Sequence, residues 1–240
     1  MAHSHRQIVY MERLDMQRPA IVEAFEGATR AGIRGESEID LWLRTLPDLI
    51  APTGRIIACD PFYCADTPPF MVETPTGQYP VILSMAHFSS TGDERITAVM
   101  LRIADAPAVR WELAVCEEDT EQESPESYTF GVDSGFASFM DEAAINAIFD
   151  TIETTNAEGN DVYYEDAADY LQRRLESLRP AGGAEWFNMT LDERSGANAL
   201  IFTSGWGDGS YRSYWGFDAQ DQPVCLITDF GVLDDARLIE

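Results

Sequence analysis

Three aspartates in turn-like motifs are the residues of this chain whose types and positions could support chemistry. Asp133 and Asp208 lie in short glycine-containing motifs, and Asp229 ends an apolar, strand-like run. Carboxylate oxygens are ligands that Ca²⁺ prefers, and sites are often built on loops at strand ends. The sequence therefore leaves open a metal site made of Asp133, Asp208 and Asp229. An enzyme or small-ligand pocket in which His87 joins them is the related alternative, provided that the side chains converge.

The other catalytic patterns are incomplete. Cys59 and Cys64 are spaced like half a zinc site, but no second pair follows at metal-ligand spacing. The motif Gly131-Val-Asp-Ser-Gly resembles a nucleophile elbow, yet Ser134 is not at the centre of a G-x-S-x-G pattern. A helix cap made by Asp133 or Ser134 is therefore favoured there. The chain also lacks a P-loop, a dinucleotide-binding glycine fingerprint and an H-E-x-x-H motif, so we expect no enzyme and no cofactor.

The segment Gly205-Trp-Gly-Asp-Gly-Ser-Tyr carries the densest signal in the chain. Its glycines permit backbone angles that other residues resist, so a plain hairpin turn is one interpretation. The functional interpretation places Trp206, Asp208 and Tyr211 in a surface that binds a partner, because aromatic side chains beside a polar loop make good anchors.

The charge of the chain limits the classes of partner. It has 16 basic residues, all arginine, and 42 acidic residues, which give a net charge of −26. Nucleic-acid binding needs clustered cations, and anionic lipid surfaces repel acidic proteins, so we expect no nucleic-acid and no membrane partner. The acidity could attract a basic protein or simply keep the chain soluble.

Part of this charge is concentrated in residues 117–126, which read as an exposed acidic loop. This loop is the second candidate for contact with a basic partner. Its acidic residues are Glu117, Glu118, Asp119, Glu121, Glu123 and Glu126. The N-terminal residues lack the apolar core of a signal peptide, and so we expect a cytoplasmic protein.

The elements that must position these residues follow from hydrophobic periodicity. Helical spacing predicts helices at 37–46, 137–151 and 163–178. Branched and aromatic runs between turn signals predict strands at 54–59, 79–86, 95–103, 109–116, 128–132, 185–191, 199–204, 211–217 and 224–230.

These elements predict an α+β fold with a predominantly antiparallel sheet of about eight or nine strands and roughly three helices. Residues 1–53 are expected to form a helical or irregular segment that packs on a main β-rich domain at 54–240.

Several motifs occur in an order that resembles a known family. They are Gly54-Arg-Ile-Ile-Ala-Cys-Asp-Pro, Tyr79-Pro-Val, Trp111-Glu-Leu-Ala, Gly131-Val-Asp-Ser-Gly with Phe139-Met-Asp, Ser204-Gly-Trp-Gly-Asp-Gly-Ser-Tyr, and Thr228-Asp-Phe. Over about 54–233, this arrangement resembles the bacterial family called domain of unknown function 4241. The acidic stretch at 117–126 departs from the family pattern.

The resemblance implies a function of the immunity type, as in bacterial polymorphic toxin systems. Such a protein would act as an antitoxin that binds a cognate toxin domain and blocks its active site by occlusion. The expected partner is then a basic protein, met through the acidic loop and the turn at Trp206, Asp208 and Tyr211.

Overall fold

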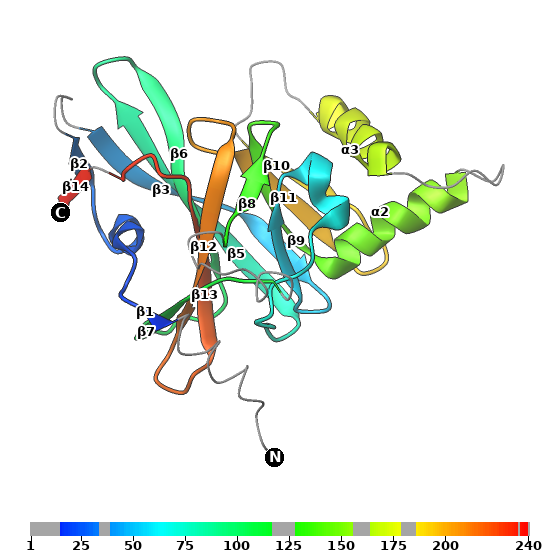
Figure 1. Cartoon of the computed structure of the whole chain (residues 1–240), viewed down its shortest axis with the longest axis horizontal. Helices are drawn as coiled ribbons and strands as arrows, with labels where there is room; N and C mark the ends of the chain where they lie inside the picture. The colour runs from blue at the N-terminus through cyan, green and yellow to red at the C-terminus, as the bar shows by residue number, and fades with distance from the viewer. Residues whose placement is uncertain are drawn as a thin grey trace. The chain divides into compact units, whose positions relative to one another are not determined.

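The computed structural model of the chain describes residues 15–33, 39–116, 128–155, 164–178, 186–234 and 236–239 (Figure 1). The chain forms two compact units that interleave along the sequence. Unit 1 comprises Met1–Leu46, Pro80–Thr129 and Tyr211–Glu240, and unit 2 comprises Pro47–Tyr79 and Phe130–Ser210. Neither unit corresponds to the predicted segments 1–53 and 54–240, and that domain boundary stays a prediction.

Unit 1 is built on a long sheet whose hydrogen-bonded order mixes early and late strands. Its order is β1 (Asp15–Met16), β7 (Arg110–Leu113), β12 (Gly209–Phe217), β13 (Pro223–Asp229), β6 (Asp93–Arg102), β5 (Gly77–Phe88), β3 (Ile39–Ala51), β2 (Arg30–Ile33) and β14 (Ala236–Ile239). Central neighbours such as β5 and β6, β6 and β13, and β13 and β12 pair antiparallel. The run Ile96–Leu101 of β6 is buried on both faces, as its largely apolar sequence requires. The 3₁₀-helix η1 (Ala20–Phe25) buries four of its six residues.

Unit 2 is a smaller sheet covered by two helices. Its strands lie in the order β10 (Trp186–Thr190), β11 (Asn198–Thr203), β9 (Phe136–Asp141) and β4 (Ile56–Cys59), all antiparallel. Helices α2 (Glu142–Thr155) and α3 (Tyr164–Leu178) share one apolar core with the sheet and lie beside it in Figure 1. Two short elements complete the unit, namely the 3₁₀-helix η2 (Pro61–Asp66) and strand β8 (Phe130–Val132).

The predicted α+β class with predominantly antiparallel sheet is confirmed. The predicted helix at 163–178 matches α3, and the predicted strands of the middle and C-terminal parts match β4 to β8 and β10 to β13. Among the described residues, no helix is both long and apolar enough to cross a membrane.

The helix predicted at 37–46 is wrong, because the described part of this segment, from Ile39, belongs to strand β3. Ile39 and Leu41 are buried and Asp40 between them is exposed, which is the alternation of a strand. The same apolar residues also fit a helical period. The pairing of Ile39 with Ala31 of the neighbouring strand β2 selects the strand over the helix.

The helix predicted at 137–151 begins too early. Residues up to Asp141 form strand β9, which pairs with β11 on one side and with β4 on the other. Helix α2 starts only at Glu142. Short local runs of apolar residues do not distinguish a buried strand from a buried helix, and here the two neighbouring strands impose the extended form.

Gly54, in the loop before β4, occupies a conformation that a side chain cannot share. Its φ angle is +76°, and a Cβ atom built on it would lie 2.0 Å from the carbonyl oxygen of Thr74. The carbonyl oxygen of Gly54 accepts hydrogen bonds from the backbone N–H of Thr74 at 2.8 Å and from its hydroxyl at 3.3 Å. The close approach of the two chain segments therefore depends on glycine at this position.

We expect Gly54→Ala to lower the free energy of unfolding by about 3 kcal/mol or more, because it adds both backbone strain and a clash with the Thr74 backbone. Urea denaturation followed by circular dichroism measures this loss. The matched control is Gly131→Ala in the same unit, where a Cβ atom would meet nothing within 4 Å. Equal stability of the two variants would contradict the role of the close approach.

Candidate functional site

A buried carboxylate, Asp60, holds together two of the motifs in unit 2. Its side chain is 1% exposed. One carboxylate oxygen accepts the backbone N–H of Phe62 at 3.0 Å, which caps helix η2. The other oxygen accepts the backbone N–H groups of Asp133 at 3.0 Å and Ser134 at 2.9 Å. Asp60 therefore fixes the turn between β8 and β9 to the end of strand β4.

Asp60 is suited to this task by its sequence neighbours. Aspartate is a preferred capping residue, and Pro61 supplies the φ angle of a first helical residue without needing a hydrogen-bond acceptor. The cap that we predicted at Asp133 or Ser134 is wrong, because strand β9 and not a helix follows them. The Ser134 hydroxyl instead accepts the backbone N–H of Phe136 at 3.2 Å, within the turn.

The turn held by Asp60 also contacts the glycine-rich segment before β12. The carbonyl oxygen of Gly135 accepts the backbone N–H of Ser204 at 3.1 Å. Gly135 has a φ angle of +72°, and a Cβ atom on it would lie 4.0 Å from the Cα atom of Gly207. Three motifs far apart in the sequence thus meet at one place in unit 2.

The segment 204–207 is a tight turn closed by its own hydrogen bonds. The hydroxyl of Ser204 donates to the carbonyl oxygen of Gly207 at 2.8 Å, and the N–H of Gly207 donates to the carbonyl oxygen of Ser204 at 2.8 Å. Ser204 is fully buried, and Gly205 and Gly207 have φ angles of +54° and +112°. The turn carries Trp206, whose side chain is 58% exposed. The structure therefore presents a large aromatic side chain from a tightly hydrogen-bonded base.

The predicted partner-binding residues separate into three groups. Trp206 and Asp208 are exposed at this turn, as a contact surface requires. Tyr211 is 8% exposed and packs edge-on against Phe230 within unit 1, with ring centroids 5.0 Å apart, so it does not belong to the exposed surface. Its burial follows from the alternation of β12, in which Tyr211, Ser213 and Trp215 all point to the interior.

The third group is the acidic loop, and it lies outside the described residues. It comprises Glu117, Glu118, Asp119, Glu121, Glu123 and Glu126. Their part in partner binding stays a prediction.

The alternative metal site is not assembled. In the described ranges, no group of three or more His, Cys, Asp or Glu side chains is placed to hold a metal ion, so Asp133, Asp208 and Asp229 do not converge on one. Asp229 is engaged locally, since its carboxylate accepts the backbone N–H of Gly231 at 2.9 Å. His87 lies on β5 opposite Glu94 of β6.

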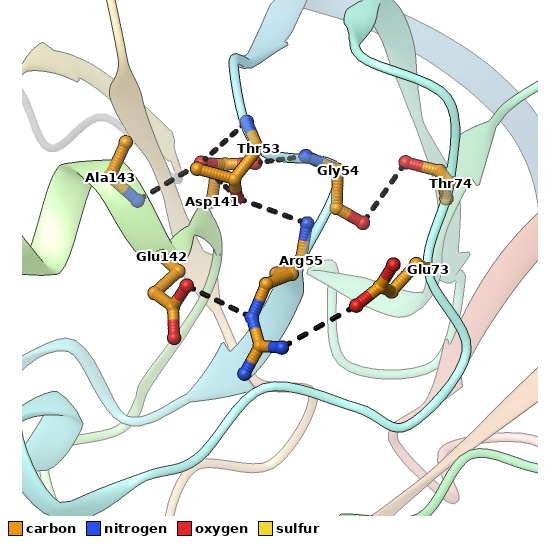
Figure 2. Close-up of polar contacts among 8 residues, drawn as sticks. All are labelled: Thr53, Gly54, Arg55, Glu73, Thr74, Asp141, Glu142 and Ala143. Carbon is orange, nitrogen blue, oxygen red and sulfur yellow. Dashed lines mark hydrogen bonds and ion pairs between the residues drawn. The ribbon is translucent and has the colours of Figure 1, made fainter.

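A second buried carboxylate, Asp141, joins two chain segments of unit 2 (Figure 2). It is 0% exposed and lies at the junction of β9 and α2. Its oxygens accept the hydroxyl of Thr53 at 2.9 Å and the backbone N–H groups of Thr53 at 3.2 Å, Gly54 at 2.9 Å and Ala143 at 2.9 Å. Asp141 thus caps helix α2 and anchors the loop before β4.

Around this anchor, Arg55 bridges two acidic side chains at the surface. Its guanidinium lies 2.9 Å from a carboxylate oxygen of Glu142 and 3.4 Å from one of Glu73 (Figure 2). An aspartate directly before the helical run Glu142-Ala-Ala is a sequence signal for a cap that could have identified Asp141. The bonds to Thr53 and Gly54 have no local signal, because 87 or more residues separate the partners.

We expect Asp141→Asn to lower the free energy of unfolding by about 2–4 kcal/mol, because an amide NH₂ group would replace an acceptor that faces N–H donors. Chemical denaturation measures the loss. Glu142→Gln is the matched control, since it removes the neighbouring charge from a partly exposed ion pair and should cost less than about 1 kcal/mol. An Asp141→Asn protein as stable as this control would rule out the anchoring role.

Asp229 makes stability depend on pH. Burial raises the pKa of its carboxyl to about 6, the bond from Gly231 opposes the rise, and the nearby charge of Asp234 adds to it. Because this pKa is raised on folding, the folded chain binds the proton more tightly than the unfolded chain. The resulting stabilisation is present in acid and is lost as the pH rises through about 6.

We therefore expect Asp229→Asn to raise the free energy of unfolding at pH 7.5 by about 1–3 kcal/mol and to change it little at pH 4. The introduced amide would keep an oxygen that can accept the N–H of Gly231. Urea denaturation at both pH values tests this, with the exposed Asp234→Asn as control, which should have a much smaller effect. A loss of stability at pH 7.5 on substituting Asp229 would contradict the expectation.

Comparison with known proteins places the chain in a family. The family model described as "Protein of unknown function (DUF4241)" matches residues 49–228, which include Asp60, Asp141 and the turn at Trp206. No curated protein and no solved structure matches the chain. The match covers three quarters of the sequence, and the chain therefore belongs to the DUF4241 family.

Proposed function

We propose that this protein is an immunity-type inhibitor that acts in the bacterial cytoplasm. It binds a cognate toxin domain and blocks the toxin's active site by occlusion. The observation that carries the proposal is the turn at residues 204–208, which presents the exposed Trp206 and the exposed Asp208 from a chain of net charge −26.

The geometry of this turn supports a role in binding. Large aromatic side chains, tryptophan above all, contribute most of the binding energy at many protein interfaces. Binding also costs entropy when a contact loop must first become ordered. The hydrogen bonds from Ser204 to Gly207 and from Ser204 to Gly135 hold the turn in one conformation beforehand. A smaller part of the binding energy is then lost on ordering.

The charge of the chain supports a basic partner. Toxin domains that act on nucleic acids or nucleotides bind anionic substrates, and clefts for such substrates are basic. An acidic inhibitor would be attracted to such a cleft before contact, which raises the association rate. Asp208 beside Trp206 adds an acceptor for a cationic side chain, and the acidic residues of 117–126 add further charge to the same protein.

In the proposed mechanism no covalent bond is made or broken. Trp206 enters the entrance of the toxin's cleft, Asp208 pairs with a cation at its rim, and the bulk of unit 2 excludes the substrate. The motifs resemble those of the DUF4241 family, and the function that this resemblance implies is of the same immunity class.

The test is co-expression of the full chain with the toxin domain encoded beside it. We expect a stable complex on co-purification and rescue of the poisoned cells. Trp206→Ala should weaken the complex by about 2 kcal/mol or more, which is roughly thirtyfold in dissociation constant. Leu43→Ala, which removes another exposed apolar side chain, is the control and should have little effect.

Salt dependence of the association rate tests the electrostatic part separately. Attraction between the acidic chain and a basic cleft is screened by ions, so the association rate should fall steeply between low and physiological salt while the dissociation rate changes less. A flat response would remove the steering argument. Absence of both complex and rescue would remove the proposed function.

A further inference from the structure

Unit 1 contains a cavity of about 310 Å³, and Trp111 of the Trp111-Glu-Leu-Ala motif forms part of its lining. It lies between η1, the end of β6, the loop 104–108, β7 and β13. Its apolar lining includes Phe25, Met100, Trp111 and Val224, each at most 8% exposed. A preformed cavity of this size, with apolar walls and a few polar groups, is the usual form of a small-molecule site.

The sequence keeps this space open with small residues. The loop that forms one wall is Ala104-Asp-Ala-Pro-Ala, which offers no long apolar side chain to fill the cavity. Gly216 of β12 allows lining residues to pack closely behind it. A Cβ atom there would lie 2.8 Å from the sulfur of Cys225, 2.9 Å from Ala108 and 3.0 Å from Trp111. The cavity wall is therefore closely packed, and the space in front of it is not filled by those side chains.

Among the described residues that line the cavity, Arg102 is the one with a basic side chain. Arg102 of β6 is the direct cross-strand partner of Cys225 on β13, so both side chains project from the same face of the sheet. Both line the cavity. Burial raises the pKa of the Cys225 thiol to about 12, which leaves it neutral at physiological pH. The polar groups that β6 and β13 contribute to the lining are thus the exposed guanidinium of Arg102 and a neutral thiol.

Two acidic side chains, Glu26 and Asp105, also line the cavity. Glu26 lines the cavity but forms an ion pair with Arg18. Asp105 lies on the wall loop. The charged groups that affect the pKa of the Cys225 thiol are Arg102, which lowers it, and Glu26, which raises it. Within the described ranges, no carboxylate forms an ion pair with Arg102.

We propose that this cavity binds a small molecule with an apolar body and a single anionic head, such as a carboxylate. The body lies against Phe25, Met100 and Trp111, and the head pairs with the guanidinium of Arg102, which can donate two parallel hydrogen bonds to it. The net charge of −26 opposes each further negative charge on a ligand, so a head with a single negative charge fits this cavity better than a polyphosphate. The cavity and its lining support this site whether or not the protein binds a toxin.

Three probes with one apolar chain and different heads test the proposal by calorimetric titration of the full chain. The probes are octanoate, octanol and octylammonium. We expect octanoate to bind at least about tenfold more tightly than octanol, and octylammonium to bind most weakly. Arg102→Gln should lower the octanoate affinity at least about tenfold and leave octanol unchanged. Arg44→Gln removes the same charge from an exposed position outside the cavity and should change neither affinity.

Ala106→Phe fills the cavity from its wall loop and should abolish binding of octanoate and octanol alike. Thermal unfolding checks that Ala106→Phe is folded. If Ala106→Phe does not fold, the test depends on Arg102→Gln, which changes an exposed side chain. The proposal is overturned if none of the probes binds, if octylammonium binds as well as octanoate, or if Arg102→Gln leaves the octanoate affinity unchanged. Octanoate binding that persists in folded Ala106→Phe would also overturn it.

Discussion

A carboxylate removed from water is stable only if hydrogen-bond donors replace the water, and unit 2 is organised around that constraint. Asp60 is 1% exposed and accepts backbone N–H groups from Phe62, Asp133 and Ser134. Each bond also satisfies a backbone donor in a helix end or turn. The same hydrogen bonds therefore satisfy the buried carboxylate and the backbone donors. Two of these bonds join chain segments that are more than 70 residues apart.

This constraint connects the interior of unit 2 to its exposed turn. Asp60 holds the turn at Asp133 and Ser134, Gly135 of that turn accepts the N–H of Ser204, and Ser204 closes the turn that carries Trp206. A surface aromatic residue is therefore positioned by a buried charge several hydrogen bonds away. The family match includes every residue of this chain of contacts.

The aspartates of this acidic protein serve different physical roles. Asp60 and Asp141 are buried and bonded to backbone donors, and they stabilise junctions between elements. Asp229 is largely removed from water, and its carboxylate accepts the backbone N–H of Gly231. Desolvation outweighs this bond and raises the pKa of Asp229 to about 6. Asp208 is exposed and contributes to the surface charge. Composition alone treats these residues as equivalent, although they differ in burial and in hydrogen-bond partners.

Local sequence determined the strands of the middle and C-terminal parts, helix α3, the acidic character of the chain and the glycine-rich turn at Trp206. Each of these rests on alternation, helical spacing or composition, which are properties of neighbouring residues. Tertiary structure alone decided that Ile39 begins a strand and that residues 137–141 are extended, because pairing with β2, β4 and β11 selects between two periods that the apolar residues fit equally. It also decided that Tyr211 is buried and that Asp141 anchors Thr53 and Gly54. Hydrogen bonds between residues so far apart in the sequence leave no local pattern, and they appear only when the chain has folded.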